Sequence, residues 1–161
     1  MELATFITLT TLLFWFFFLI KKRLSFIQNS ILFMVIGIIT KNYLTIMMLE
    51  LGRVRMLEDH TLYVSLLLYR DFIIPLTILI FANAYLETST SIQKLFCSLS
   101  ALLFLVIIEG FLVYFNVIIF TDWSLLHEAV VNAIYLLIGL IFVKLILFLQ
   151  KWESRQNESH L

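Results

Sequence analysis

Long runs of apolar residues, separated by short polar segments, make up almost the whole chain. An α-helix needs about 20 consecutive apolar residues to cross the hydrocarbon core of a bilayer. The pattern predicts membrane-spanning helices at residues 3–20, 27–50, 61–86, 95–120 and 125–150. The closing segment 151–161 is polar, and we expect it to form a frayed tail. The predicted fold is therefore an all-α integral membrane protein, a bundle of five transmembrane helices in one polytopic domain, residues 1–161.

The second span admits a shorter alternative. Lys41 and Asn42 interrupt its apolar run, so the span could end at Thr40 and leave the following segment at the membrane interface. We favour the span that continues to Glu50, because a crossing of about 14–17 residues is short for a bilayer.

Composition agrees with a chain that lies in lipid. Hydrophobic residues make up 62% and charged residues 14% of the sequence, against roughly 25% charged in an average soluble domain. The formal net charge is zero, which argues against nucleic acid as a partner, since its binding needs a concentrated basic surface. In composition the chain resembles small multispan proteins of low-GC bacteria, rich in Phe, Ile, Leu and Lys. That resemblance implies a bacterial plasma membrane and carries over no functional residues.

The distribution of basic residues predicts the orientation. The cluster Lys21-Lys22-Arg23 follows the first apolar run, whereas a cleaved signal peptide has its charges in front. Cytoplasmic loops of membrane proteins are enriched in Lys and Arg. With the N-terminus outside, the cytoplasmic segments hold Lys21, Lys22, Arg23, Lys94, Lys151 and Arg155, and the external loops hold Arg53 and Arg55. We therefore expect an N-out, C-in topology.

Polar side chains inside the spans indicate a candidate site. These residues are Lys41, Arg70, Asp71, Glu109 and Asn132. A charge at the centre of a membrane helix costs roughly 2.5–3.5 kcal/mol on insertion scales, so such residues need partners or water. At about 1.5 Å per residue, Lys41 and Glu109 lie about 21 Å from the cytoplasmic starts of their spans. Arg70 and Asn132 lie roughly 13 and 10 Å inward from the external starts of theirs. All fall in the central-to-outer part of the bilayer, which predicts a mixed-charge cluster there.

Helical spacing extends each polar residue into a stripe. Residues three, four and seven apart share a helix face, and small and polar groups in membrane helices usually face other helices. The predicted inward stripes are Ser30, Met34, Gly37, Lys41 and Thr45 on the second span, Ser98, Leu102, Leu105, Glu109, Leu112 and Asn116 on the fourth, and Glu128, Asn132, Tyr135 and Gly139 on the fifth.

Pro75 lies within the third span, close to Arg70 and Asp71. Proline has no N–H and its ring crowds the carbonyl four residues back, so the Asp71 carbonyl loses its helical donor and the helix is expected to kink. Arg70 lies beside this gap. The freed carbonyl and the two charged groups could line a cavity or satisfy one another.

A second tier of candidates lies near the external surface. Asn116 is expected to form interhelical hydrogen bonds. His127 and Glu128 at the start of the fifth span could relay protons or form part of a metal site, but we favour interfacial capping and hydration, because an acid near a helix N-terminus is favourable. No HxxxH or HExxH spacing occurs. We therefore expect neither a metal site nor a cofactor.

Three functional hypotheses follow, in decreasing preference. The first is an accessory or complex-forming membrane subunit, whose intramembrane polar cluster pairs within the bundle, with another membrane protein or with a second copy. The second is an oligomeric transporter or channel component for protons, ions or a small anion. The third is an intramembrane enzyme or lipid-headgroup binding protein. An enzyme is disfavoured because every catalytic group would have to come from the spans and two short external loops.

Overall fold

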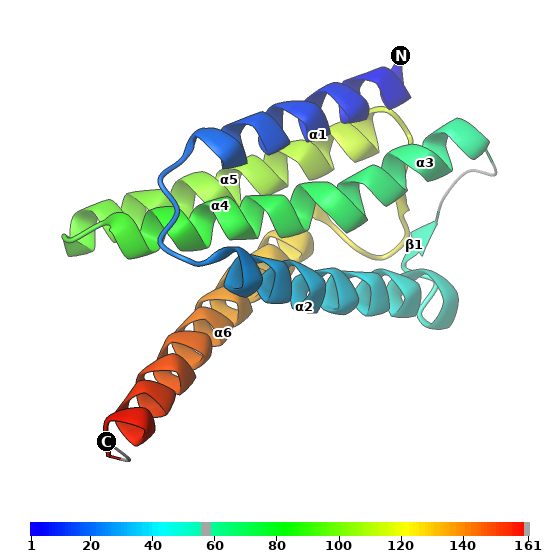
Figure 1. The fold of residues 1–161 in the computed structure, drawn as a ribbon. Coiled ribbons are helices and arrows are strands. Elements are labelled where there is room, and N and C mark those ends of the chain that lie inside the picture. Colours follow the sequence, from blue (N-terminus) through cyan, green and yellow to red (C-terminus); the bar gives the residue numbers. More distant parts are fainter. Residues whose placement is uncertain (56–58, 160–161) are drawn as a thin grey trace.

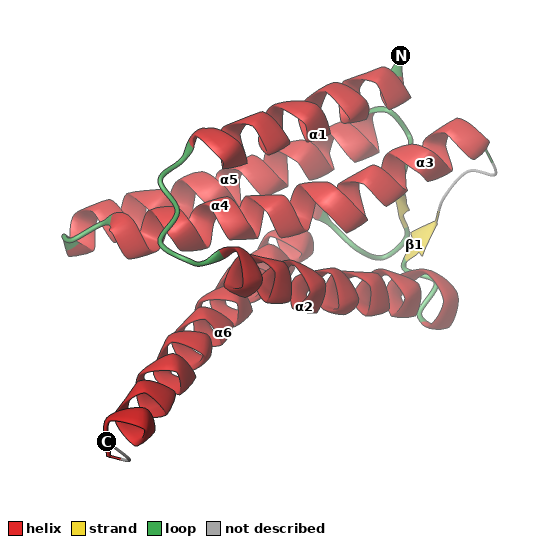
Figure 2. Ribbon diagram, in the orientation of Figure 1, coloured by secondary structure: helices red, strands yellow, loops and turns green. Residues whose placement is uncertain are grey.

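The computed structural model describes residues 1–55 and 59–159, with side chains up to residue 152. Figures 1 and 2 show a helical protein in which two very short strands pair. Its elements are α1 (Glu2–Leu19), α2 (Phe26–Thr45), η1 (Ile46–Glu50), β1 (Val54–Arg55), α3 (His60–Leu68), η2 (Tyr69–Ile73), α4 (Ile74–Glu87), α5 (Ser91–Tyr114), β2 (Ile119–Phe120) and α6 (Leu125–Ser159). The elements η1 and η2 are π-helical turns.

Several elements join into longer helices. Within the described residues, five helices are long and apolar enough to cross a membrane: Glu2–Leu19, Phe26–Glu50, His60–Glu87, Ser91–Tyr114 and Leu125–Trp152. The all-α class and the five apolar helices predicted from the sequence are therefore confirmed. The second helix continues through Lys41 to Glu50, so the shorter alternative that ended at Thr40 does not occur.

The helix starts follow from local sequence. The Ser25 side chain accepts the Gln28 N–H while the Gln28 side chain accepts the Ser25 N–H, which forms a capping box at the start of α2. Asp59 caps α3 by accepting the Thr61 N–H at 2.7 Å. Hydrogen bonds from the side chain and backbone of Thr61 hold the pKa of this exposed carboxyl below its usual value.

The prediction that the fourth helix reaches residue 120 is wrong, because α5 ends at Tyr114. Asn116 adopts a left-handed conformation, with φ of +55°. Its N–H donates to the Val113 carbonyl, and the Val117 N–H donates to the Leu112 carbonyl at 2.8 Å. These two bonds form a Schellman motif, in which asparagine takes the position usually held by glycine. The chain then enters β2 and the loop before α6.

The expected polar tail also differs from the structure. The helix α6 extends to Ser159, so residues 151–159 continue the last span as helix, and residues 160–161 lie outside the described part of the chain. The sequence of this segment, KWESRQNES, contains Lys, Glu, Arg and Gln, whose intrinsic helix propensities are high. Extending an existing helix needs no new nucleation, which favours its continuation.

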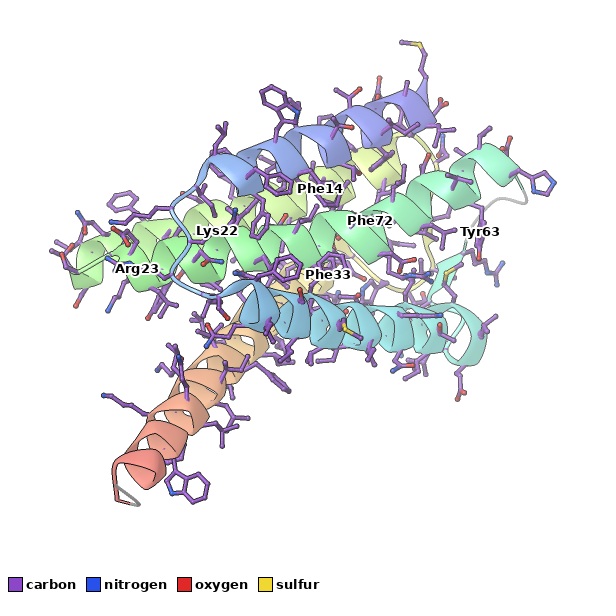
Figure 3. The ribbon with its side chains drawn as sticks, viewed as in Figure 1. Phe14, Lys22, Arg23, Phe33, Tyr63 and Phe72 are labelled. Atoms are coloured by element: carbon purple, nitrogen blue, oxygen red, sulfur yellow. The ribbon has the colours of Figure 1, made fainter. Side chains whose placement is uncertain are left out.

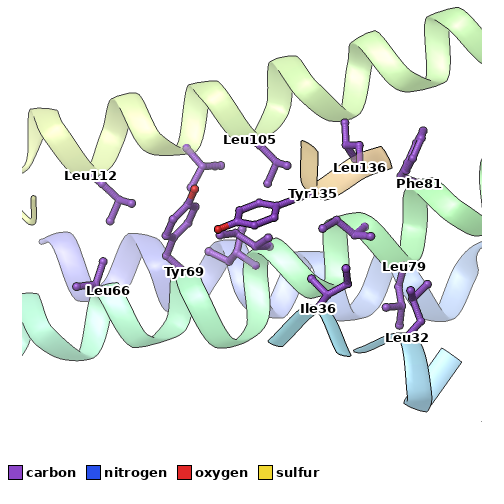
Figure 4. Packing of buried hydrophobic residues seen from close by; sticks show 14 of the residues in the cluster. Leu32, Ile36, Leu66, Tyr69, Leu79, Phe81, Leu105, Leu112, Tyr135 and Leu136 are labelled. Carbon is purple, nitrogen blue, oxygen red and sulfur yellow. The ribbon is translucent and has the colours of Figure 1, made fainter. Parts of the chain in front are cut away.

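The rod formed by α3, η2 and α4 occupies the centre of the molecule. In this rod, 61% of the apolar stretch is buried, against 11–28% in each of the other four long helices. Both α1 and α2 pack against it, and α5 and α6 pack against α4 (Figure 1). Figure 4 shows the resulting core, where leucine and aromatic side chains from several helices meet.

A π-helical turn precedes Pro75 in this rod. The Ile74 N–H donates to the carbonyl of Tyr69, five residues back, and Pro75 has no N–H to give. The Arg70 carbonyl therefore lacks its usual helical donor, and the Thr40 hydroxyl of α2 donates to it at 3.3 Å. The proline signal thus marks a real irregularity, which takes the form of a π turn satisfied from a neighbouring helix.

A buried pair of asparagines holds the connection between α1 and α2 against α4. The side-chain oxygen Oδ1 of Asn83 accepts the N–H groups of Arg23 and Leu24 at 2.9 and 3.1 Å. Its amide donates to Asn29 Oδ1 and to the Leu79 carbonyl. Asn29 in turn donates to the carbonyls of Leu24 and Ser25. Every polar atom of both side chains has a partner, so this cluster is a closed structural network.

The strands join the two loops at the opposite end of the molecule. Val54 pairs with Phe120 and Arg55 with Ile119 in antiparallel register. Next to the paired strands, the Thr121 N–H donates to the Arg53 carbonyl at 2.8 Å, and the Arg53 guanidinium lies over the Trp123 ring. Val54 is buried. The two strands therefore cap this end of the helical bundle.

The close approach of α4 and α6 gives a test of the packing. A Cβ added at Gly139 would lie 2.6 Å from Cγ2 of the fully buried Ile78, whereas one added at Gly110 meets no atom within 4 Å. Gly139→Ala is expected to lower the free energy of unfolding by about 1–3 kcal/mol. Gly110→Ala is expected to be neutral or stabilising by up to about 1 kcal/mol. Thermal unfolding in detergent compares the two variants, and equal effects would contradict this packing.

Candidate functional site

The structure divides the polar residues predicted within the spans into separate groups. Lys41 is exposed on α2 and makes no ion pair with any described residue. Arg70 pairs with its neighbour Asp71 through two contacts of 2.6 and 2.9 Å. Glu109 and Asn132 lie together in the interior. The expected mixed-charge cluster is therefore replaced by a local ion pair and a buried acidic site.

Glu109 projects from α5 into the core. Only 3% of the residue is exposed, and its Oε1 atom accepts the hydroxyl of Tyr69 at 2.6 Å. Figure 4 shows the Tyr69 side chain reaching from the central rod toward α5. The second carboxyl oxygen, Oε2, is buried and has no hydrogen-bond partner. The Oε2 atom of Glu109 is thus available for a further contact.

A second buried carboxyl group comes from the first turn of α6. Glu128 is 7% exposed, and its Oε1 atom accepts both the Trp123 indole N–H at 2.8 Å and the Tyr43 hydroxyl at 3.1 Å. The position near a helix N-terminus favours negative charge. Glu128 also lies near enough to Glu109 for the two groups to interact electrostatically.

Asn132 lies one helical turn beyond Glu128 and interacts with Glu109. The residue is completely buried, yet neither its amide nitrogen nor its oxygen has a partner with hydrogen-bond geometry. A buried polar group without a partner costs about 1–3 kcal/mol. An amide can meet either form of a carboxyl group, because Nδ2 donates to a carboxylate and Oδ1 accepts from a protonated acid.

A small cavity of about 30 Å³ lies between these groups. Glu109, Glu128 and Tyr69 contribute polar lining, and Val54 next to the strand pair helps to close it. The complete lining is Thr40, Tyr43, Leu44, Val54, Leu66, Tyr69, Arg70, Ile74, Glu109, Leu112, Ile118, Glu128 and Tyr135. Because a water molecule needs roughly 10–15 Å³ of such space, the cavity has room for about two.

Among the described residues, neither Glu109 nor Glu128 forms an ion pair with a basic group. The ion pairs in this part of the chain join Lys21 and Arg23 to Glu87, Arg70 to Asp71, and the N-terminus to Glu2. Burial of an ionised carboxylate without a counter-charge is costly, and such groups commonly become protonated instead. The hydroxyl and indole donors around the site offset part of this cost. The arrangement therefore suits groups that can gain and lose a proton.

The fifth-span stripe is confirmed, because Glu128, Asn132, Tyr135 and Gly139 are all buried. The second-span stripe is wrong. Lys41 and Met34 are exposed, and the buried face consists of Asn29, Leu32, Ile36 and Thr40. Almost every position of this helix is apolar or small, so hydrophobicity alone gives little information on which face points inward. The fourth-span stripe is buried at Leu105, Glu109 and Leu112, and exposed at Asn116.

The tyrosine and tryptophan donors were not predicted as part of the site. These donors are Tyr43, Tyr69 and Trp123. One feature of the sequence could have predicted these contacts. Tyr and Trp carry a polar atom that usually finds a hydrogen-bond partner when buried, and carboxyl groups are acceptors available in these spans.

The second-tier residues occupy different environments. Asn116 is exposed and ends α5. His127 is also exposed; its ring stacks on Trp123 with centroids 4.5 Å apart, and its Nδ1 lies 2.7 Å from the Ser124 hydroxyl. Among the described residues, no group of three or more His, Cys, Asp or Glu side chains is arranged to hold a metal ion.

Comparison with protein-family models, with curated proteins and with solved structures finds no match to this chain. Its function must therefore be inferred from the geometry of the acidic site.

The hydrogen bond from Tyr69 to Glu109 gives a direct test of the site. Tyr69→Phe removes the donor from a buried carboxyl group and is expected to lower the free energy of unfolding by about 1–3 kcal/mol. Tyr114→Phe is the matched control, because Tyr114 is 77% exposed on α5. Chemical denaturation in detergent measures both variants. Equal stability of the two would mean that the Tyr69 hydroxyl contributes nothing to holding Glu109.

Proposed function

We propose that this chain is a five-span membrane protein, oriented N-out and C-in, that binds and releases protons at Glu109 and Glu128 as a subunit of a larger membrane assembly. The five apolar helices support the membrane part of the proposal. The basic residues Lys21, Lys22, Arg23 and Lys94 lie in or beside the loops at one end, as expected of a cytoplasmic face. The strand pair then lies on the external face.

Cysteine labelling tests the orientation. Single cysteines made by Ser89→Cys and His60→Cys, in a Cys97→Ser background, are expected to react with an impermeant maleimide from opposite sides of the membrane. Both positions are exposed, so accessibility within the protein does not limit the reaction. Labelling of the two positions from the same side would contradict the proposed topology.

The observation that carries the proton-binding role is that Glu109 Oε2 and both amide atoms of Asn132 are buried without a hydrogen-bond partner, although the two residues lie close enough to interact. A proton on Oε2 would supply the donor that Asn132 Oδ1 lacks. Loss of that proton would supply an acceptor for Asn132 Nδ2. Rotation of one amide thus lets the same two residues hydrogen-bond in both protonation states. Intramembrane ionisable groups commonly mark proton and ion pathways.

The size and charge of the site restrict what it can bind. A cavity of about 30 Å³ is too small for an organic substrate, because ligand pockets usually measure about 300–1,000 Å³. Two carboxyl groups disfavour an anion, and Arg70, which also lines the cavity, is already paired with Asp71. Trp123, which donates to Glu128, lies beside the exposed His127, so the site is closer to solvent on the strand-pair side.

The proposed role as a subunit is supported by what lies on the other side of the site. Toward the basic end, the interior contains fully buried apolar side chains, including Leu105, Ile78 and Val143, and the asparagine network there is closed on itself. We therefore expect no continuous polar path from Glu109 to that end among the described residues.

Between residues 144 and 152, α6 has no buried residue and exposes Phe148 and Trp152, while Gln150 accepts a hydrogen bond from Gln28 of α2 at 2.9 Å. Figure 1 shows the end of this helix diverging from the other helices. The exposed Phe148 and Trp152 side chains offer a surface to a partner span.

Infrared difference spectroscopy tests the proton site. A pH jump applied to the reconstituted protein is expected to change the carbonyl-stretch band of a protonated carboxyl group. Glu109→Gln should remove a large part of that change, because an amide cannot take up the proton. Glu50→Gln, at an exposed position at the end of η1, is the control and should leave the band intact. An unchanged band in Glu109→Gln would overturn the proposal.

Proton flux separates the subunit from a self-sufficient pathway. Proteoliposomes that contain only this chain are expected to pass protons no faster than empty vesicles, because the apolar interior closes the site toward the basic end. Flux that Glu109→Gln abolishes would instead establish the chain as a complete proton carrier.

A further inference from the structure

A groove of about 520 Å³ lies between α1, α2 and α4, apart from the acidic site. Figure 3 shows Phe14, Phe33 and Phe72 converging on it from three elements, with Lys22 near the connection between α1 and α2. Its lining consists of Phe14, Phe17, Phe18, Lys22, Phe26, Asn29, Ser30, Phe33, Met34, Phe72, Leu76 and Leu79. The volume falls within the range of small-molecule sites.

The walls of the groove are apolar and aromatic. Phe72 contacts Phe14 and Phe33, with ring centroids 6.1 and 6.4 Å apart, and so joins α1 to α2 at the end of the groove away from Lys22. The polar residues of the lining are already engaged, because Asn29 belongs to the asparagine network and the Ser30 hydroxyl donates to the Phe26 carbonyl. An unbranched hydrocarbon chain matches this surface.

A single cation lies at the mouth of the groove. Lys21 and Arg23 both pair with Glu87, whereas Lys22 makes no ion pair with any described residue. The Lys22 ammonium group lies over the rings of Phe17 and Phe18, 4.9 and 5.1 Å from their centroids. The helix α2 begins beside it, and the N–H groups of its first turn favour anions. The mouth is therefore positively charged.

We infer that this groove binds an anionic phospholipid, with one acyl chain against Phe14, Phe33 and Phe72 and the phosphate group at Lys22. The inference rests on the proposed membrane insertion, which puts Lys22 at the level of the cytoplasmic headgroups. One lysine near an anionic membrane surface attracts acidic lipids measurably. The bound lipid fills the space between the three helices.

A second groove provides an internal comparison. It lies between α1, α4 and α5, has a volume of about 610 Å³ and is lined by Leu9, Leu12, Leu13, Phe16, Thr77, Ile80, Phe81, Ala84, Cys97, Ser100, Ala101 and Phe104. No lysine or arginine occurs in this lining. The second groove has a similar apolar surface for an acyl chain, but its lining contains no cation that would bind a phosphate group. Selectivity for anionic lipid is therefore expected only at the groove that contains Lys22.

Native mass spectrometry with defined lipids tests the inference. The full chain is released from micelles that contain equal amounts of phosphatidylglycerol and phosphatidylcholine, and the ratio of the two bound lipids is measured. Wild type is expected to retain phosphatidylglycerol preferentially, and Lys22→Gln to lower the ratio about fivefold. Lys94→Gln is the control, because Lys94 lies over Tyr85 at the same end of the molecule and outside the groove. An equal ratio in wild type, or equal losses in both variants, would overturn the inference.

A second variant tests the position of the acyl chain. Met34→Trp is expected to fill the groove and reduce retention of phosphatidylglycerol, whereas Ala101→Trp fills the second groove and should leave it unchanged. Circular dichroism confirms that each variant is folded. If the folded Met34→Trp variant retains phosphatidylglycerol as wild type does, the proposed position of the acyl chain is wrong. The Glu109→Gln variant leaves the lining of the groove intact and should still retain phosphatidylglycerol in preference to phosphatidylcholine, so failure of the proton site and failure of the lipid site give different results.

Discussion

Polar groups within the apolar interior must find their partners inside the protein, and this requirement organises the central rod. Asn83 meets it completely, because its side chain contacts two backbone N–H groups, one backbone carbonyl and Asn29. The Thr40 hydroxyl donates a hydrogen bond to the Arg70 carbonyl, which the π turn and Pro75 leave without a helical donor. These contacts fix α2 and the connection before it against α4. A buried polar group without a hydrogen-bond partner destabilises the fold by more free energy than a formed hydrogen bond contributes.

In the acidic site, by contrast, some buried polar atoms have no hydrogen-bond partner. Glu128 has two donors on one oxygen, whereas Glu109 has one donor and an unpartnered second oxygen beside the unpartnered amide of Asn132. A purely structural network would resemble that of Asn83, with every atom satisfied. This contrast within one molecule is the physical basis of the proposal that Glu109 binds and releases a proton.

Much of the fold, and part of the site, could be predicted from the sequence. Length and hydropathy predicted the five apolar helices, and the spacing of Glu128, Asn132 and Tyr135 predicted the buried face of the last one. The buried face of the second helix could not be predicted, because its apolar positions surround the helix and Lys41 was a misleading marker. The pairing of Arg70 with Asp71 was one of two alternatives that the sequence left open, because the sequence does not show whether a long flexible side chain folds back onto its neighbour. Contacts such as Tyr69 with Glu109 depend on how the helices pack, which single-helix periodicity does not contain.

The two proposed sites meet at one irregular turn of the central rod. Within η2, Tyr69 donates to Glu109, and three residues later Phe72 closes the groove by contacting Phe14 and Phe33. A π turn holds one residue more than an α-helical turn, so its conversion to α-helix would rotate the residues on one side of it relative to those on the other. Binding free energies at linked sites are reciprocal. A lipid that alters this turn would therefore change the proton affinity of Glu109, and protonation of Glu109 would change the affinity for that lipid by the same factor.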